Sequence, residues 1–167
     1  MHANSDSVTG FLNCRRIAVA GVSRKGDTAA SNIMKKLLNA GYEAIPVNPH
    51  AGEIDGLKCY PDLKSIPEPV DAVMIATHPD HSATIVEQCA ELGIGHIWFH
   101  RSFGNGSVFD EAITLCEEKG LNPIVGGCPL MYIEPVDVFH ACVRWWQERI
   151  SNKELLLSGK NSTESNM

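Results

Sequence analysis

Short apolar runs alternate with helical patterns along most of the chain. Between these runs, apolar residues recur every three or four positions, as in Ile33, Met34 and Leu37, and such a repeat ends at a glycine like Gly41. Buried strands that alternate with amphipathic helices are typical of a parallel sheet covered on both faces. The pattern predicts a three-layer α/β domain with strands at residues 16–20, 43–47, 71–76, 95–99 and 121–125.

The two ends of the chain lack this alternation. We interpret residues 1–14 as an N-terminal arm, residues 15–150 as a single domain and residues 151–167 as a polar tail, disordered after about residue 157. Apolar side chains at helical spacing within 136–150 predict a last helix that packs on the core or supports a homodimer contact. Residues 57–60 are expected to form a short extra strand.

The first apolar run ends in a turn that suits phosphate binding. Gly21-Val22-Ser23 follows the strand, and a helical pattern begins soon after Thr28. A glycine at this point lets backbone N–H groups approach phosphate oxygens next to a helix N-terminus. A P-loop is disfavoured, because Asp27-Thr28 replaces the Lys-Ser/Thr pair that such a loop requires.

The identity of two residues narrows the choice of nucleotide. A dinucleotide site usually reads G-x-G-x-x-G and closes its second strand with a carboxylate that binds the ribose. This chain has Ser23 in place of the second glycine and Asn48 in place of the carboxylate. NAD is therefore disfavoured, and a ribose-phosphorylated nucleotide such as coenzyme A or NADP is favoured, with Arg24 or Lys25 available to neutralise a phosphate.

Composition excludes several other classes of function. The formal net charge of the 167 residues is -6, which disfavours general binding to nucleic acid or to an anionic membrane. The six cysteines form no C-x-x-C pair and are interpreted as reduced thiols. No run approaches the roughly 18 apolar residues that cross a bilayer, and the first residues lack a secretion pattern. We expect a cytoplasmic protein with no membrane segment.

Several motifs together resemble the stand-alone CoA-binding protein family, which is related to the nucleotide-binding domain of the succinyl-CoA synthetase alpha subunit. The resemblance covers about residues 15–135, and its matching stretches lie at residues 17–23, 41–49, 60–63, 70–73 and 128–129. It implies a Rossmann-like, flavodoxin-like sheet with the strand order 3-2-1-4-5. It also implies coenzyme A as the ligand.

The resemblance implies a role for three segments and one lysine. Gly21, Val22 and Ser23 would bind the pyrophosphate of coenzyme A, with Lys25 as a counter-charge. The corner Val47, Asn48 and Pro49 would form the wall beside the adenosine and the ribose phosphate. Ala76, Thr77 and His78 would cover the other side of the nucleotide.

Three further motifs could each have either a chemical role or only a structural one. His78, Asp80 and His81 could ligate zinc, but the segment also reads as a helix entry capped by Asp80. His100 is the best acid/base candidate, yet a loop histidine without chemistry explains it as well. Cys128 could be a reactive thiol or a structural cysteine in a turn. We favour the structural reading in each case and expect no metal site.

The sequence therefore predicts a protein that binds CoA or an acyl-CoA and acts as a binding module, carrier or regulator. The synthetase alpha subunit carries its phosphorylated histidine in a second domain, and we find no such domain in these 167 residues. We accordingly expect no self-contained enzyme. Two alternatives stay open: an oxidoreductase that uses NADP, and a subunit that acquires activity in an acyl-CoA-processing complex.

Overall fold

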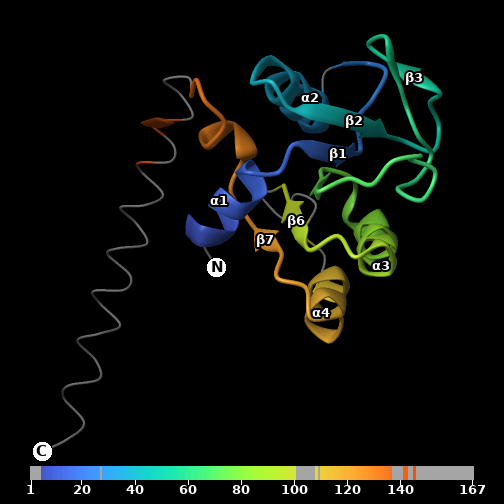
Figure 1. The fold of residues 1–167 in the computed structure, drawn as a ribbon, viewed down its shortest axis with the longest axis vertical. Coiled ribbons are helices and arrows are strands. Elements are labelled where there is room, and N and C mark those ends of the chain that lie inside the picture. Colours follow the sequence, from blue (N-terminus) through green and yellow to red (C-terminus); the bar gives the residue numbers. More distant parts are fainter. Residues whose placement is uncertain are drawn as a thin grey trace, which may run out of the picture.

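The protein folds into one parallel sheet with helices on both faces (Figure 1). The computed structural model describes residues 5–26, 28–100, 108, 110–136, 141–142 and 145. Its helices are α1 (Ser5–Leu12), α2 (Ala29–Asn39), α3 (Ser82–Leu92) and α4 (Asp110–Glu118), with short 3-10 turns η1 (Pro79–His81) and η2 (Pro129–Met131). Its strands are β1 (Arg16–Ala20), β2 (Glu43–Val47), β3 (Glu53–Ile54), β4 (Leu57–Lys58), β5 (Ala72–Ile75), β6 (His96–Phe99) and β7 (Ile124–Val125).

The order of the strands differs from the sequence prediction. The main sheet runs β2-β1-β5-β6-β7, which is 2-1-3-4-5 for its five strands in chain order, whereas 3-2-1-4-5 was expected. The order 2-1-3-4-5 is the one found in flavodoxin-like folds. The predicted flavodoxin-like fold is therefore confirmed, whereas the predicted strand order 3-2-1-4-5 is wrong. Pro46 gives the physical reason, because a strand residue without an N–H is tolerated at a sheet edge and not inside a sheet.

The β1 strand lies in the middle of the structure and contributes to both cores. Ile17 and Val19 face the cluster covered by α1 and α2, whereas Ala18 and Ala20 face the cluster covered by α3 and α4. All four side chains are at most 1% exposed. This burial on both sides explains why the strand reads as a continuous apolar run in the sequence.

The first helix was missing from the sequence interpretation, which described residues 1–14 only as an arm. In the structure, α1 packs against β6, and its Phe11 is fully buried. The Phe11 ring meets Trp98 edge to face, with 5.3 Å between the ring centroids. The helix thus closes one core of the domain.

Turn chemistry sets the start of α2 and the end of α3. The Thr28 hydroxyl caps α2 by accepting a hydrogen bond from the Ser31 N–H. Gly93 ends α3 in the left-handed conformation with φ of 70°. The start of α3 is different, because its N-cap is His81 and not Asp80, whose Oδ2 lies 3.3 Å from Nδ1 of His78 instead.

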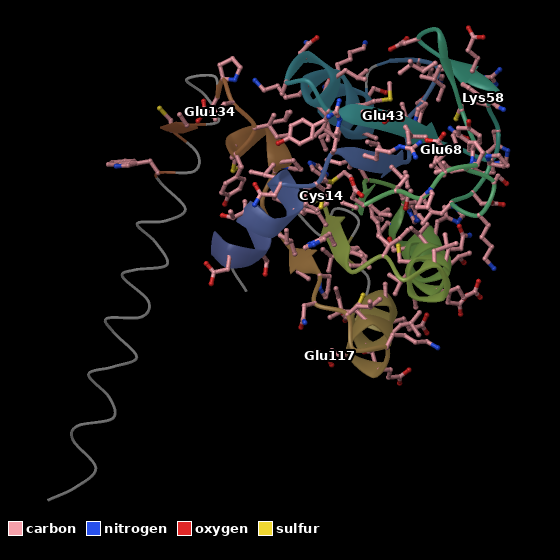
Figure 2. The ribbon with its side chains drawn as sticks, viewed as in Figure 1. Cys14, Glu43, Lys58, Glu68, Glu117 and Glu134 are labelled. Atoms are coloured by element: carbon pink, nitrogen blue, oxygen red, sulfur yellow. The ribbon has the colours of Figure 1, made fainter. Side chains whose placement is uncertain are left out.

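A clamp of polar contacts holds the amino end of the sheet. Arg16 pairs with Glu43 and with Glu68, each at 3.0 Å, and Figure 2 labels these two carboxylates close together. Asp71 accepts hydrogen bonds from the N–H groups of Arg15 and Arg16, and these bonds hold the pKa of Asp71 below its usual value. Because Asp71 directly precedes β5, the contact fixes β5 beside β1.

Some sequence predictions fall outside the described residues. The expected tail at 151–167 and most of the expected helix at 136–150 belong to this part of the chain. The extra strand expected at 57–60 is found as β4, which pairs with β3.

Among the described helices, none has the length and apolar character needed to cross a membrane.

Replacing Phe11 with Ala should lower the free energy of unfolding by about 3–5 kcal/mol, because it leaves a cavity beside Trp98. Leu92→Ala is the matched control, since Leu92 is 47% exposed and its truncation should cost less than about 1 kcal/mol. Urea unfolding of both variants measures the difference. Equal losses would show that α1 does not close the core.

Candidate functional site

A cleft of about 490 Å³ opens at the carboxyl end of the sheet. The chain moves to β2 on one side of β1 and then returns to β5 on the other side. Parallel α/β sheets bind ligands where the strand order reverses in this way. The residues that line the cleft come from the ends of β1, β2 and β5, from the loop after β4 and from α3: Ala20, Gly21, Thr28, Val47, Asn48, Pro49, His50, Pro61, Asp62, Leu63, Ala76, Thr77, His78, His81, Thr84, Ile85 and Gln88.

The structure brings most of the predicted site residues to this cleft. Those that line it are Gly21, Val47, Asn48, Pro49, Ala76, Thr77 and His78. The other three lie in the turn after β1 without lining the cleft: Val22 is fully buried, Ser23 is half-buried and Lys25 is exposed. The roles of both groups of residues in ligand binding stay predictions.

Gly21 is required by the geometry of the first turn. Its φ is +98°, and a Cβ atom built on it would lie 2.4 Å from the carbonyl oxygen of Ala76. A side chain here would therefore clash with the backbone at the end of β5. The missing side chain lets the turn after β1 cross the end of β5 at the floor of the cleft.

Buried hydroxyl groups join this turn to the start of α2. The Ser31 side chain is fully buried, and its Oγ lies 2.9 Å from Oγ1 of Thr28. Ser31 Oγ also accepts a hydrogen bond from the Ser23 N–H at 3.4 Å. The turn and the helix N-terminus are thus held as one unit, which is the arrangement that phosphate binding uses elsewhere.

Asn48 connects the two predicted phosphate and ribose segments. Its Nδ2 donates a hydrogen bond to the Val22 carbonyl at 2.7 Å, and its Oδ1 accepts one from the His50 N–H at 2.8 Å. The side-chain amide is therefore engaged with the backbone on both sides. Asn48 shapes the corner of the cleft and fixes the position of the first turn.

The sequence interpretation missed one wall of the cleft. Leu63 and Gln88 belong to this wall and are linked, because the Leu63 N–H donates a hydrogen bond to Gln88 Oε1 at 2.9 Å. The lining residues at the N-cap of α3 and along that helix, 81, 84, 85 and 88, follow the spacing of one helical face. That spacing was the available signal, but no motif in the sequence indicates that the loop at residues 61–63 meets this face.

A carboxylate also lies in the cleft, although none ends β2. Asp62 lines the cleft, and its Oδ1 accepts hydrogen bonds from both the N–H and the hydroxyl of Ser65 at 2.8 Å. These bonds orient the side chain within its own loop. Asp62 is the only Asp or Glu among the described lining residues.

His100 and Cys128, the other candidates for chemistry, do not line the cleft. The backbone of His100 is held to the end of β5 by a hydrogen bond to the Ile75 carbonyl, and burial lowers the pKa of its side chain. Cys128 is 3% exposed and precedes η2. The described residues contain no group of three or more His, Cys, Asp or Glu side chains arranged to hold a metal ion. The residues 101–107 that follow His100 lie outside the described part of the chain.

Comparison with known families agrees with this geometry. Residues 15–134 match the sequence profile of a family described as "CoA binding domain". The chain belongs to the CoA binding domain family. This membership confirms the family resemblance noted in the sequence, and the Rossmann-like fold of the domain is confirmed as well.

Individual known proteins are also similar to this chain. The uncharacterized protein YneT of Bacillus subtilis is 33% identical over 68% of this chain and 82% of its own. The acetate–CoA ligase [ADP-forming] II of Archaeoglobus fulgidus is 37% identical over 48% of this chain, and the match spans only 12% of that ligase. A solved structure of a hypothetical protein from Pyrococcus horikoshii has a TM-score of 0.68 at 31% identity and covers 74% of this chain and 84% of its own.

Gly21→Ala should lower the free energy of unfolding by about 3 kcal/mol or more, because the new Cβ must push against the Ala76 carbonyl. Gly41→Ala is the control: Gly41 also has a positive φ, of +88°, but nothing lies within 4 Å of its Cβ position. Only the backbone strain of about 1–2 kcal/mol is expected there. Denaturant unfolding of the two variants isolates the clash, and equal costs would disprove the close approach.

Asn48→Asp should destabilise the protein by about 1–3 kcal/mol, because a carboxylate oxygen would replace the Nδ2 donor and face the Val22 carbonyl. Asn122→Asp introduces the same charge at an exposed loop position and should change stability by less than about 0.5 kcal/mol. Thermal unfolding at neutral pH compares the two. If Asn48→Asp is tolerated as well as the control, the corner does not depend on the amide.

Proposed function

We propose that this protein binds coenzyme A or an acyl-CoA in the cleft at the carboxyl end of the sheet. Membership of the CoA binding domain family is the observation that carries the proposal. The volume of about 490 Å³ falls within the roughly 300–1,000 Å³ range of sites that bury a small ligand. The pyrophosphate would occupy the side of the cleft formed by Gly21 and Thr28.

Two features of the cleft support its use for an anionic nucleotide. The turn after β1 is bonded to the N-terminus of α2 through Ser23 and Ser31, and the dipole of that helix favours negative charge there. The corner after β2 carries an amide at Asn48 and an exposed His50, in place of the carboxylate that ends β2 in NAD sites. Apolar side chains such as Leu63 and Ile85 offer a surface for the adenine ring.

We further propose a binding, carrier or regulatory role without chemistry of its own. The titratable side chains among the described lining residues are three histidines and Asp62. Cys128 and His100, the candidates for nucleophile and acid/base, are placed away from that lining. None of the cysteines at 14, 59, 89, 116, 128 and 142, all in the described part of the chain, forms a disulfide, which supports a cytoplasmic location.

A role as part of a larger activity is the second candidate. The relative from Archaeoglobus fulgidus is named as an acetate–CoA ligase, and only 12% of its length matches this chain. A chain of this kind could supply CoA binding to a complex whose other subunits carry the chemistry. An oxidoreductase that uses NADP would instead require a hydride acceptor site beside the nicotinamide.

Titration calorimetry of the purified protein with CoA, acetyl-CoA, NAD and NADP tests the proposal. We expect binding of CoA or acetyl-CoA in the micromolar range or tighter, and weaker or no binding of NAD and NADP. Binding of NADP alone would contradict the proposal and favour the oxidoreductase. Stronger binding of acetyl-CoA than of CoA would identify an acyl-CoA as the ligand.

A pair of substitutions on α3 links any binding to the cleft. Thr84 and Glu87 are both exposed on this helix, but only Thr84 lines the cleft. Thr84→Trp should fill the cleft and weaken CoA binding by about tenfold or more, whereas Glu87→Trp should leave the affinity unchanged. Equal affinities for both variants would place the ligand elsewhere.

A further inference from the structure

In the described part of the chain, the cleft proposed to bind CoA is lined by histidines and not by lysine or arginine side chains. No Lys or Arg is among the described residues that line it, although CoA carries several negative charges. Arg24 and Lys25 are exposed in the turn after β1 and are not among the lining residues. Three histidines line the cleft instead: His50, His78 and His81.

These histidines flank the predicted phosphate turn from two sides. His50 follows the corner of β2, and its backbone N–H is fixed by the Asn48 side chain. His78 and His81 follow β5, with 6.4 Å between their ring centroids. Since β1 lies between β2 and β5, the turn at Gly21 lies between the two groups.

All three histidines are exposed to solvent. The side chains of His78 and Asp80 are 70% and 71% exposed, and Nδ1 of His78 lies 3.3 Å from Oδ2 of Asp80. That pairing leaves the Nε2 edge of the ring to meet a ligand. Asp62, in the loop after β4, is the one carboxylate among the described lining residues, and its Oδ1 accepts a hydrogen bond from the Ser65 N–H.

We propose that His50, His78 and His81 supply the positive charge that the cleft presents to ligand phosphates, so that binding takes up protons. This inference rests on the proposed function. Imidazole in water passes from mostly neutral at pH 8 to mostly protonated at pH 6, and a nearby phosphate favours the protonated form. The affinity for a phosphorylated ligand is therefore highest at low pH and falls as the pH rises from 6 to 8.

The ligand's own titration must be separated from that of the protein. The phosphomonoester on the ribose of CoA loses a second proton near pH 6, which strengthens its charge as the pH rises. Dephospho-CoA lacks this group, and its pyrophosphate keeps a constant charge between pH 6 and 8. A change in the affinity for dephospho-CoA over this range thus belongs to the protein.

The test is titration calorimetry with dephospho-CoA and with CoA at pH 6, 7 and 8, in two buffers of different ionisation enthalpy to count protons. Each exposed imidazole should contribute about a two- to threefold gain on protonation, so dephospho-CoA should bind about tenfold tighter at pH 6 than at pH 8. The variant carrying His50→Gln, His78→Gln and His81→Gln should lose this dependence and the proton uptake. Since all three side chains are exposed, the variant should remain folded, which its thermal unfolding verifies.

His96→Gln is the matched control, because His96 is exposed at the amino end of β6 and does not line the cleft. This variant should keep the pH dependence of the wild-type protein. Binding with a flat pH profile, or a profile that survives the triple substitution, would overturn the inference and leave CoA binding intact. No binding of either ligand at any pH would overturn the proposed function itself.

Discussion

The close approach between Gly21 and the Ala76 carbonyl is the constraint on which the site depends. A Cβ atom at position 21 would lie 2.4 Å from that oxygen, so the first turn crosses the end of β5 only without a side chain. This crossing places the turn after β1 at the point where the strand order reverses. The Asn48 amide and the Ser31 hydroxyl then fix the turn from its two sides. Together these contacts define the floor of the cleft before any ligand arrives.

The sequence predicted the elements well wherever burial leaves a local signal. The apolar run Ile17–Ala20 reveals β1 because both faces of this strand are covered. The order of the strands could not be predicted in the same way, because it depends on which strands pair across long distances in the chain. Pro46 contained a hint that β2 lies at the edge, since proline has no N–H to donate inside a sheet. The first helix escaped prediction because only two buried residues, Val8 and Phe11, mark it.

The candidate site shows a similar division. The segments at the ends of β1, β2 and β5 were predicted, because such strand ends meet at one edge of a parallel sheet. The wall formed by the 61–63 loop and α3 was not, because it depends on a tertiary contact between Leu63 and Gln88. Asn48 was predicted as a wall of the ribose site, whereas its side chain is bonded to backbone groups on both sides. The sequence indicated that Asn48 lies at the site, but not that its side chain would hold the backbone of the two neighbouring segments.

The clamp around Arg16 has a consequence for how such a protein can change. Arg16, at the start of β1, pairs with Glu43 and Glu68 at the amino end of the sheet, while the cleft lies at the carboxyl end. Contacts that hold the strands together are thus separated in space from the residues proposed to meet a ligand. Substitutions of exposed cleft residues such as Thr84 leave the clamp intact, so ligand preferences can change at these positions at little risk to the fold. A domain built this way is well suited to reuse inside larger enzymes.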